Sequence, residues 1–169
     1  KLIGIEVTGS MLKAVCLDGG GNVVGGLQTP IFRKEETAPQ LIGFLKDLTE
    51  KFGEFEKVGI AVPGLISRET QRVAFSTHFP EHEKIDLLGE LAASAKQKII
   101  IENDANAAAY GEFRLGAGRG SRNMFYVTLG KGVGGALIFD GRIWHGAAGF
   151  AGEFGHIAIN EDGVKLEDV

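Results

Sequence analysis

The feature that most constrains the fold is a pattern of strands and glycine turns that occurs twice. Near the start of the chain, alternating apolar residues at 3–7, 12–17 and 23–27 are separated by a Thr-Gly-Ser turn and a second turn that contains Asp-Gly. The same order of strand, glycine turn, strand, Asp-Gly turn and strand returns over residues 124–144. The two occurrences begin roughly 120 residues apart, which predicts a duplicated fold whose second copy is entered but not finished.

The region between the two occurrences alternates helical and strand patterns. Apolar residues with the helical period predict a helix over 41–48, with Thr37 as its candidate cap, and a second helix over 86–95. Short apolar runs at 58–62 and 99–101 predict buried strands. The first copy is therefore expected to be an α/β unit with three antiparallel strands first and two parallel strands added.

The glycine-rich segment 116–120 is the expected joint between two lobes, because consecutive glycines leave the backbone free to hinge. We therefore predict a first domain over 1–117 and the beginning of a second over 118–169. A complete second copy would need many more residues than the polar, acidic segment 160–169 provides.

Composition excludes several classes of protein. The net charge is −4 and no long block of Lys or Arg occurs, so no nucleic-acid-binding surface is expected in this segment. The single cysteine, Cys16, excludes an internal disulfide framework, and no apolar run reaches the roughly 18–20 residues that span a membrane. Because the chain starts without a signal-peptide pattern, the cytoplasm is the expected compartment.

The two glycine turns are candidate phosphate-binding sites. Thr8-Gly9-Ser10 and the segment 130–135 each join two predicted antiparallel strands, where successive backbone N–H groups can form a nest for phosphate oxygens. Neither segment has the pattern of a P-loop or of a dinucleotide-binding fingerprint. Taken singly, each is better explained as an ordinary hairpin turn. Their recurrence in both copies favours a pair of turns that hold a polyphosphate.

A buried strand that ends in Asn103-Asp104 and runs directly into an Ala-rich helix over 104–113 gives the candidate catalytic residue. Polar side chains at the carboxyl end of such a strand lie where α/β folds bind ligands. Asp104 could serve only as a helix N-cap, but the string Asn-Asp-Ala-Asn-Ala is more than a cap requires. A carboxylate there can accept the proton of a substrate hydroxyl during phosphoryl transfer.

A third candidate group is the pair Glu153 and His156 at the end of the small-residue segment 146–156. The i, i+3 spacing places the two side chains close together on a helix or a tight turn. Alone, such a pair is more often a surface ion pair than a site. Surrounded by so many glycines, it is interpreted as a polar grip for a ligand.

These segments together resemble the ROK family of sugar kinases and sugar-responsive repressors, which have a ribonuclease H-like fold of the actin and hexokinase type. The resemblance runs from about Ile3 to Ile159. The segments that carry it are 102–108, 117–120, 145–156, the sugar-side loop Val62-Pro63-Gly64, and Phe79-Pro80 in the place of an Asn-Leu-Pro segment.

The resemblance implies an α/β fold of this duplicated type, ATP and Mg²⁺ as cofactors, Asp104 as the general base, and a homodimer in the full protein. The sugar contacts that it implies are Gly64, His78, Asn103, Asp104, Glu153 and His156. The phosphate contacts that it implies are Glu6, Gly9, Ser10, Lys13, Gly130, Lys131 and Gly132.

In this family the histidine at His156 also begins a zinc motif that a downstream run of cysteines completes. Structural zinc takes four ligands, and Cys16 is the only cysteine of the chain, so Zn²⁺ at His156 would lack its partners. Cys16 itself is expected to be a small buried residue in a strand. His82, in an acidic Glu-His-Glu-Lys run, is expected to be a solvated surface residue with no role.

The first turn departs from the family pattern Asp-x-Gly-Gly-Thr-Lys. Glu6 replaces the aspartate, Thr8 adds a side chain where bare backbone is usual, and Met11 removes a positive charge. In the second turn, Lys131 stands where a threonine is usual. That lysine could restore the lost positive charge or block the turn.

Three functions are open at this point. The first is a glucokinase-like, ATP-dependent phosphorylation of a hexose or N-acylhexosamine, with Asp104 as the base. The second is the sugar-sensing part of a ROK-type transcriptional repressor without kinase activity, which the altered first turn favours. The third is a structural fragment whose adenosine pocket lies beyond Val169. The kinase is preferred, because most of the family phosphorylates sugars and Lys131 can supply a cation. Sugar and nucleotide are the expected partners, and a membrane is not.

Overall fold

A computed structural model describes residues 1–130 and 132–168 of the chain. The chain forms two compact units. Lys1–Ile66 and Thr70–Asp104 make up the first unit, and Ser67–Glu69 and Ala105–Val169 make up the second. The domain boundary expected after Ala117 stays a prediction.

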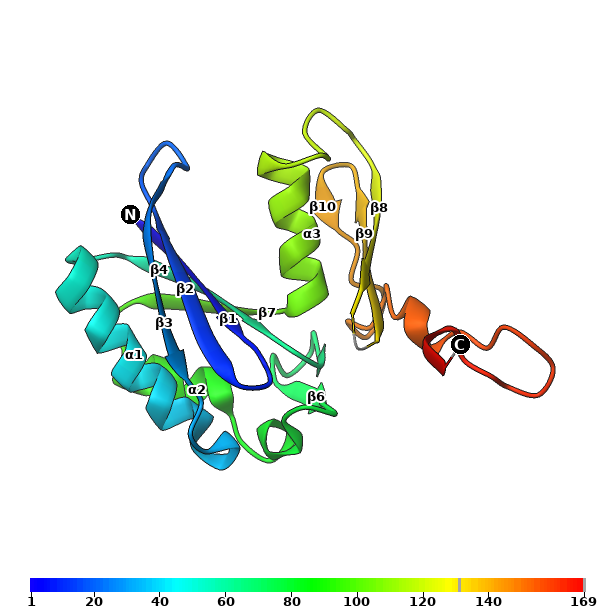
Figure 1. Cartoon of the computed structure of the whole chain (residues 1–169), viewed down its shortest axis with the longest axis horizontal. Coiled ribbons are helices and arrows are strands. Elements are labelled where there is room, and N and C mark those ends of the chain that lie inside the picture. The colour runs from blue at the N-terminus through cyan, green and yellow to red at the C-terminus, as the bar shows by residue number, and fades with distance from the viewer. Residues whose placement is uncertain (131, 169) are drawn as a thin grey trace. The chain divides into compact units, whose positions relative to one another are not determined.

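The first unit is built on a five-stranded sheet with the strand order β3–β2–β1–β4–β7 (Figure 1). The strands are β1 (Leu2–Val7), β2 (Met11–Leu17), β3 (Val23–Pro30), β4 (Lys57–Val62) and β7 (Lys98–Asn103). β2 is antiparallel to both β1 and β3, whereas β4 and β7 extend the sheet parallel to β1. The expected mixed sheet, with three antiparallel strands first, is confirmed.

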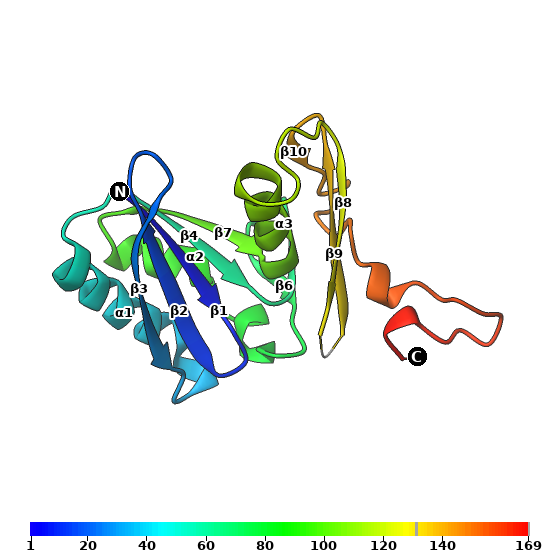
Figure 2. The same cartoon turned by 45° about the horizontal axis from the view of Figure 1, so that its top comes forward.

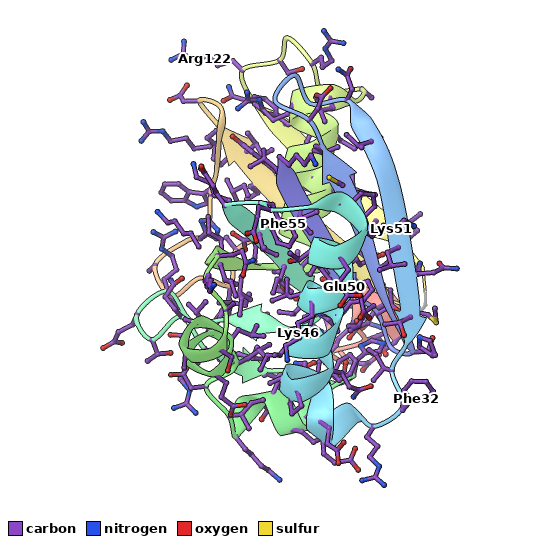
Figure 3. The ribbon with its side chains drawn as sticks, turned by 90° about the vertical axis from the view of Figure 1, so that its left-hand side faces the viewer. Phe32, Lys46, Glu50, Lys51, Phe55 and Arg122 are labelled. Atoms are coloured by element: carbon purple, nitrogen blue, oxygen red, sulfur yellow. The ribbon has the colours of Figure 1, made fainter. Side chains whose placement is uncertain are left out.

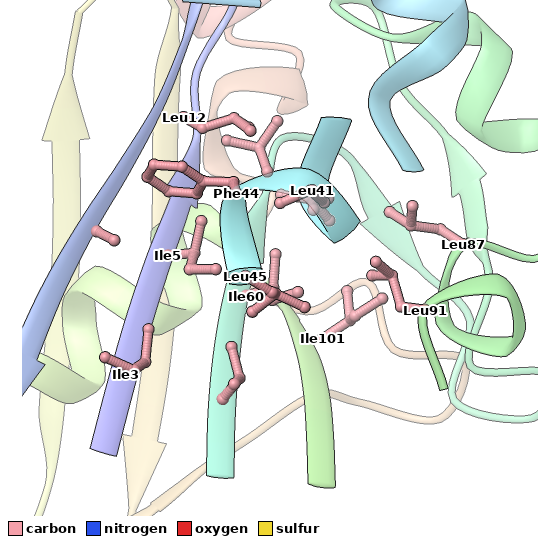
Figure 4. Packing of buried hydrophobic residues seen from close by; sticks show 14 of the residues in the cluster. Ile3, Ile5, Leu12, Leu41, Phe44, Leu45, Ile60, Leu87, Leu91 and Ile101 are labelled. Atoms are coloured by element: carbon pink, nitrogen blue, oxygen red, sulfur yellow. The ribbon is translucent and has the colours of Figure 1, made fainter. Parts of the chain in front are cut away.

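Two helices, α1 (Thr37–Phe52) and α2 (Leu87–Ser94), pack on the sheet of the first unit. In α1 the buried side chains recur at helical spacing, so they form one apolar stripe along the helix. Figure 4 shows Leu41, Phe44 and Leu45 of this stripe over Ile5 and Ile60 of the sheet. Every second residue of the central strands points into this core, because side chains alternate between the two faces of a strand.

The outer face of α1 is charged. Lys46, Glu50 and Lys51 are exposed on it, and Figure 3 views the molecule from this side. The Lys51 ammonium group donates a hydrogen bond to the Gly26 carbonyl oxygen at 2.9 Å. The last turn of α1 is therefore tied to the edge strand β3.

Thr37 is the first residue of α1 rather than its cap, so the expected cap is wrong. Glu36 occupies the cap position and makes no side-chain capping hydrogen bond. A 3-10 helix, η1 (Lys34–Glu36), leads directly into α1, and the Thr37 side chain is buried. The helix therefore continues directly from this preceding turn, with Glu36 at its cap position.

A small hairpin and a second 3-10 helix follow β4, and the sequence patterns did not predict them. The hairpin pairs β5 (Leu65–Ile66) with β6 (Val73–Phe75), and η2 (Pro80–Glu83) comes after it. Such short strands contain too few residues for an alternating pattern to emerge. They nevertheless shape the loop that follows the carboxyl end of β4.

The second unit contains a three-stranded sheet and one helix, visible in Figures 1 and 2. The sheet has the order β10–β9–β8, and its core packs Ala109 and Phe113 of α3 against Ala136 and Ile138 of β9. The elements are α3 (Asp104–Leu115), β8 (Met124–Leu129), β9 (Val133–Phe139), β10 (Arg142–Ile143), η3 (Phe154–His156) and η4 (Leu166–Asp168). The expected restart of strand, turn, strand and strand is confirmed, and the second copy is partial.

Within the part of the chain that the structure describes, no helix has both the length and the apolar character needed to cross a membrane.

His82 is fully buried, at 0% exposure, so the expectation of a solvated surface residue is wrong. Residues i and i+3 lie above one another in a 3-10 helix, and His82 stacks in this way on Phe79, with ring centroids 4.7 Å apart. Neither ring nitrogen has a hydrogen-bond partner among the described residues. Burial lowers the pKa of His82, and the nearby Glu81 carboxylate opposes this in part.

We predict that the free energy of unfolding falls as the pH drops below 6.5, the ordinary pKa of histidine. Because the pKa of His82 is lower in the folded protein, the unfolded chain binds more protons in this window, and acid favours unfolding. The contribution of neutral His82 to the free energy of unfolding is complete above pH 6.5 and is lost as the pH falls below it. Urea unfolding at about pH 8, 7, 6 and 5 measures the dependence.

His82→Leu removes the titrating group and should weaken this pH dependence. His78→Gln, which changes an exposed histidine, should keep the wild-type dependence. The same pH dependence in wild type and in His82→Leu would show that His82 is not its source.

Candidate functional site

The carboxyl ends of three strands meet at one edge of the first-unit sheet. β1, β4 and β7 are parallel neighbours, and their register aligns Glu6 with Ala61 and Ala61 with Glu102. The chain therefore leaves the same edge at Thr8, at Pro63 and at Asp104. Ligands bind at this edge in open α/β sheets.

The sugar-side loop at Pro63-Gly64 is held by Asn103. The Asn103 side-chain amide donates a hydrogen bond to the Gly64 carbonyl oxygen at 3.0 Å. Gly64 has a φ of +129°, and a Cβ at this position would lie 2.5 Å from the Phe75 carbonyl oxygen. Only glycine fits this close approach. The structure thus brings Gly64 and Asn103, two of the predicted sugar contacts, together.

Asp104 follows Asn103 at the junction of β7 and α3. The strand ends at Asn103, the helix begins at Asp104, and both side chains are half-buried. The Glu102 carboxylate accepts a hydrogen bond from the Asn103 backbone N–H at 2.9 Å, which fixes the last residue of the strand. A negative charge in the first turn of a helix is also stabilised by the helix dipole.

Ser76 organises the loop that carries His78, and the sequence patterns did not single it out. Its hydroxyl donates to the Pro63 carbonyl oxygen at 2.8 Å and accepts from the Phe79 N–H at 3.1 Å. Its own N–H donates to the Glu83 carboxylate at 2.9 Å. This buried serine joins the sugar-side loop to the segment that carries the exposed His78.

His78 lies beside the first glycine turn. Its ring carbon Cδ2 is 3.7 Å from the point where a Cβ on Gly9 would stand. The predicted sugar contact His78 and the predicted phosphate contact Gly9 are therefore neighbours within the first unit.

In the first turn, the Thr8 hydroxyl occupies the backbone donors. It accepts hydrogen bonds from the Met11 N–H at 2.9 Å and from the Ser10 N–H at 3.4 Å. It also lies 3.1 Å from the Met11 carbonyl oxygen, to which it donates. Across the hairpin, the Lys13 ammonium is 3.7 Å from the Glu6 carboxylate, and both side chains are about half exposed. The turn's own hydroxyl thus accepts from two of the turn's backbone N–H groups.

The second turn is narrow. The Gly130 N–H donates to the Gly132 carbonyl oxygen at 3.0 Å, and both glycines are exposed. Lys131, a predicted phosphate contact, lies outside the described residues. The predicted phosphate contacts of the two turns belong to different units.

Glycines allow η3 to lie directly on β9 in the second unit. A Cβ on Gly155 would stand 2.3 Å from the Val133 carbonyl oxygen, and one on Gly152 would stand 2.6 Å from the Gly135 carbonyl oxygen. The Phe154 ring lies over the bare backbone of Gly135. This backbone contact fixes the segment that carries Glu153 and His156.

Glu153 and His156 are neighbours, as the i, i+3 spacing predicts, and a further carboxylate joins them. The His156 Nε2 atom is 3.8 Å from the Glu153 carboxylate, and the Nδ1 atom is 2.8 Å from the Glu167 carboxylate. Glu167 stands out in no motif of the sequence. A weak signal existed, because Asp162-Gly163 is a turn dipeptide between two short apolar stretches.

The segment before this pair is fixed by Arg68. Its guanidinium group is 2.9 Å from the His145 Nδ1 atom, and its backbone N–H donates to the Ala148 carbonyl oxygen at 3.2 Å. Arg68 belongs to the short stretch Ser67–Glu69 that is part of the second unit. The glycine-rich segment thus has an anchor at its beginning as well as on β9.

The described residues fit Mg²⁺ at Glu6 but do not fit zinc at His156. No group of three or more His, Cys, Asp or Glu side chains that could hold a metal is found among the described residues. Zinc at His156 does not fit the described residues, because their one thiol, that of Cys16, is buried in β2. Mg²⁺ needs only one or two carboxylates beside phosphate oxygens, and the exposed Glu6 meets that requirement.

The mixed sheet, its helices and the partial second copy define an α/β protein of the ribonuclease H-like, actin and hexokinase type. The chain belongs to the ROK family, whose model matches residues 2–166.

Its relatives include enzymes and repressors. The chain is 32% identical to the glucokinase of Streptomyces coelicolor over 162 residues, which cover 96% of this chain and 51% of the relative. It is 29% identical to the xylose repressor of Bacillus subtilis over 169 residues, with coverage of 96% and 44%. A solved ROK family glucokinase from Streptomyces griseus, in complex with glucose and AMPPNP, matches with a TM-score of 0.80 and 29% identity, covering 95% of this chain and 51% of that chain. The chain spans about half the length of the curated relatives it matches.

We predict that Gly155→Ala destabilises the second unit and displaces η3. The added Cβ would meet the Val133 carbonyl oxygen, and overpacking of this kind costs about 1–3 kcal/mol. Gly111→Ala is the matched control, because its Cβ meets no atom within 4 Å and it lies inside α3. The control should gain about 0.5–1 kcal/mol from helix propensity. Denaturant unfolding distinguishes the two, and equal stability of both variants would contradict the contact.

Proposed function

We propose that the protein phosphorylates a sugar hydroxyl with ATP, that its substrate is a hexose or an N-acylhexosamine, and that Asp104 is the general base. The observation that carries the proposal is the edge of the first-unit sheet, where parallel strands end in a glycine turn, in Pro63-Gly64 and in Asn103-Asp104. The glucokinases among the relatives support it. The homodimer stays a prediction.

In this reaction Asp104 accepts the proton of the sugar hydroxyl. The hydroxyl oxygen forms a bond to the γ-phosphorus of ATP, while the bond from that phosphorus to the β,γ-bridging oxygen breaks and ADP leaves with the electron pair. Regular backbone holds Asp104 on both sides, with β7 before it and α3 after it. A base fixed in this way needs little rearrangement to meet its substrate.

Each unit supplies part of the remaining contacts. In the first unit, sugar contacts are Gly64, His78 and Asn103, and phosphate contacts are Glu6, Gly9, Ser10 and Lys13. In the second unit, sugar contacts are Glu153 and His156, and phosphate contacts are Gly130, Lys131 and Gly132. Mg²⁺, when bound with ATP, neutralises charge on the phosphate oxygens, and Glu6 is the carboxylate that would hold it.

The first turn favours a second candidate function, a sugar sensor without kinase activity. The Thr8 hydroxyl already occupies the N–H groups of Ser10 and Met11, so a phosphate would have to displace it. The sugar-side hydrogen bond between Asn103 and Gly64 is unaffected by this closure. The xylose repressor among the relatives supports this alternative.

We predict that Asp104→Asn lowers turnover by about 10²- to 10⁴-fold, because an amide cannot accept the hydroxyl proton. An ATP-coupled assay over a panel of hexoses and N-acylhexosamines, run on the full-length protein, measures the loss. Calorimetry should show sugar binding retained, since the amide keeps the size of the side chain and one of its two acceptor oxygens.

Asp47→Asn is the control for this substitution, because it removes the same charge from an exposed position on α1. It should keep wild-type turnover. Equal turnover by wild type and Asp104→Asn would refute the assignment of the base. Sugar binding without turnover by the wild type would favour the sensor.

We predict that Thr8→Ala tightens nucleotide binding by about five-fold, since one hydrogen bond of ordinary strength no longer has to be displaced. Thr8→Ser keeps the hydroxyl and should bind nucleotide as the wild type does. Titration calorimetry with AMPPNP measures both variants. If Thr8→Ala binds AMPPNP with the same affinity as the wild type, the Thr8 hydroxyl does not close the turn.

A further inference from the structure

Glu167 makes the closest side-chain contact recorded for His156. Its Oε1 atom is 2.8 Å from the His156 Nδ1 atom, and its side chain is 25% exposed. The carboxylate is held from a second side by the Lys165 ammonium at 3.9 Å. Its other oxygen lies 3.2 Å from the point where a Cβ on Gly155 would stand, so it rests against the backbone of η3.

A short hairpin brings Glu167 back to His156. The Ile159 N–H donates to the Val164 carbonyl oxygen at 2.8 Å, and the Leu166 N–H donates to the Ile157 carbonyl oxygen at 3.0 Å. At the tip, the Asn160 side-chain oxygen accepts from the Val164 N–H at 3.0 Å. Hydrogen bonds of the backbone and of the Asn160 side chain therefore close this segment.

This contact occupies the ring nitrogen that a metal would otherwise be able to use. The hairpin of the described chain contributes carboxylates and amides but no thiolate, whereas structural zinc sites are built mainly from cysteine and histidine. Glu167 orients His156 as carboxylates orient the histidines of metal sites, but here the other ring nitrogen faces Glu153.

We propose that Glu167 is the positioning residue for His156 and replaces zinc in that task. The inference rests on the proposed sugar site and deepens it. An ionised carboxylate only accepts hydrogen bonds, so the proton of the neutral ring lies on Nδ1 and the Nε2 lone pair is left to accept one. The Glu153 carboxylate lies 3.8 Å from Nε2, so the His156 nitrogen and the Glu153 oxygen together present a pair of acceptors. Such a pair suits two hydroxyl donors on neighbouring carbons of a sugar.

The test uses the full-length protein with Glu167→Ala, Glu167→Gln and the control Glu161→Ala, which removes an exposed carboxylate at the hairpin tip. Long-range ¹H–¹⁵N spectra of the His156 ring, in the absence of sugar, should show the Nδ1–H form in wild type and Glu161→Ala, and its loss in Glu167→Ala. Glucose affinity should fall by about ten-fold in Glu167→Ala. Glu167→Gln, whose amide oxygen still accepts a hydrogen bond from Nδ1, should keep most of the wild-type glucose affinity.

Zinc content is measured on the same proteins by mass spectrometry. We expect less than stoichiometric zinc, and a glucose affinity that EDTA does not change. One zinc per chain that is lost in His156→Ala would overturn the inference, as would an unchanged ring tautomer in Glu167→Ala. A tautomer change in a protein that phosphorylates no sugar would refute the proposed kinase and leave the role of Glu167 intact. Sugar turnover with an unchanged tautomer would support the proposed kinase and refute the role of Glu167.

Discussion

The parallel pairing of β1, β4 and β7 is the constraint on which the site of the first unit depends. Hydrogen bonds along these strands fix their register, so three segments far apart in the sequence leave the sheet at one edge. Each exit then carries a different chemical group: the Thr8 hydroxyl bound to the N–H groups of the first turn, the Gly64 carbonyl oxygen bound to Asn103, and the carboxylate of Asp104. A slip of one residue in any strand would turn its side chains to the opposite face and separate these groups.

The second unit achieves the same precision by a different means. Its site segment has little regular structure, and its position comes from backbone lying on backbone, which Gly152 and Gly155 permit against β9. Arg68 secures the beginning of the segment and the hairpin that ends in Glu167 secures its end. The small residues that make the segment look flexible in the sequence are the ones that allow it to be held closely.

Periodicity predicted the main strands and helices because each spans enough residues for one face to be buried. Periodicity did not find β5 and β6, because these strands are too short. The expected exposure of His82 was wrong for another reason: its charged neighbours suggested contact with solvent, but the ring stacks on Phe79 and is buried. Asn103 and Asp104 became candidates through their place after a strand expected to be buried. That expectation is wrong for most of the strand, because β7 lies at the edge of the sheet, with Ile101 buried and Ile100 exposed. Ser76 and Glu167 could not be found in this way, because their roles arise from contacts with residues distant in the sequence.

The loop at Gly64 and the first glycine turn are held by separate hydrogen bonds, so the proposed sugar side and the proposed phosphate side can vary independently. The bond from Asn103 to Gly64 makes no use of the first turn, and the bonds of Thr8 make no use of the sugar-side loop. A side chain added to the turn can therefore alter nucleotide binding while the grip on a sugar hydroxyl persists. In the proposed function, the balance between kinase and sensor depends on how readily a phosphate displaces the Thr8 hydroxyl, an exchange worth only about 1 kcal/mol for a hydrogen bond of ordinary strength.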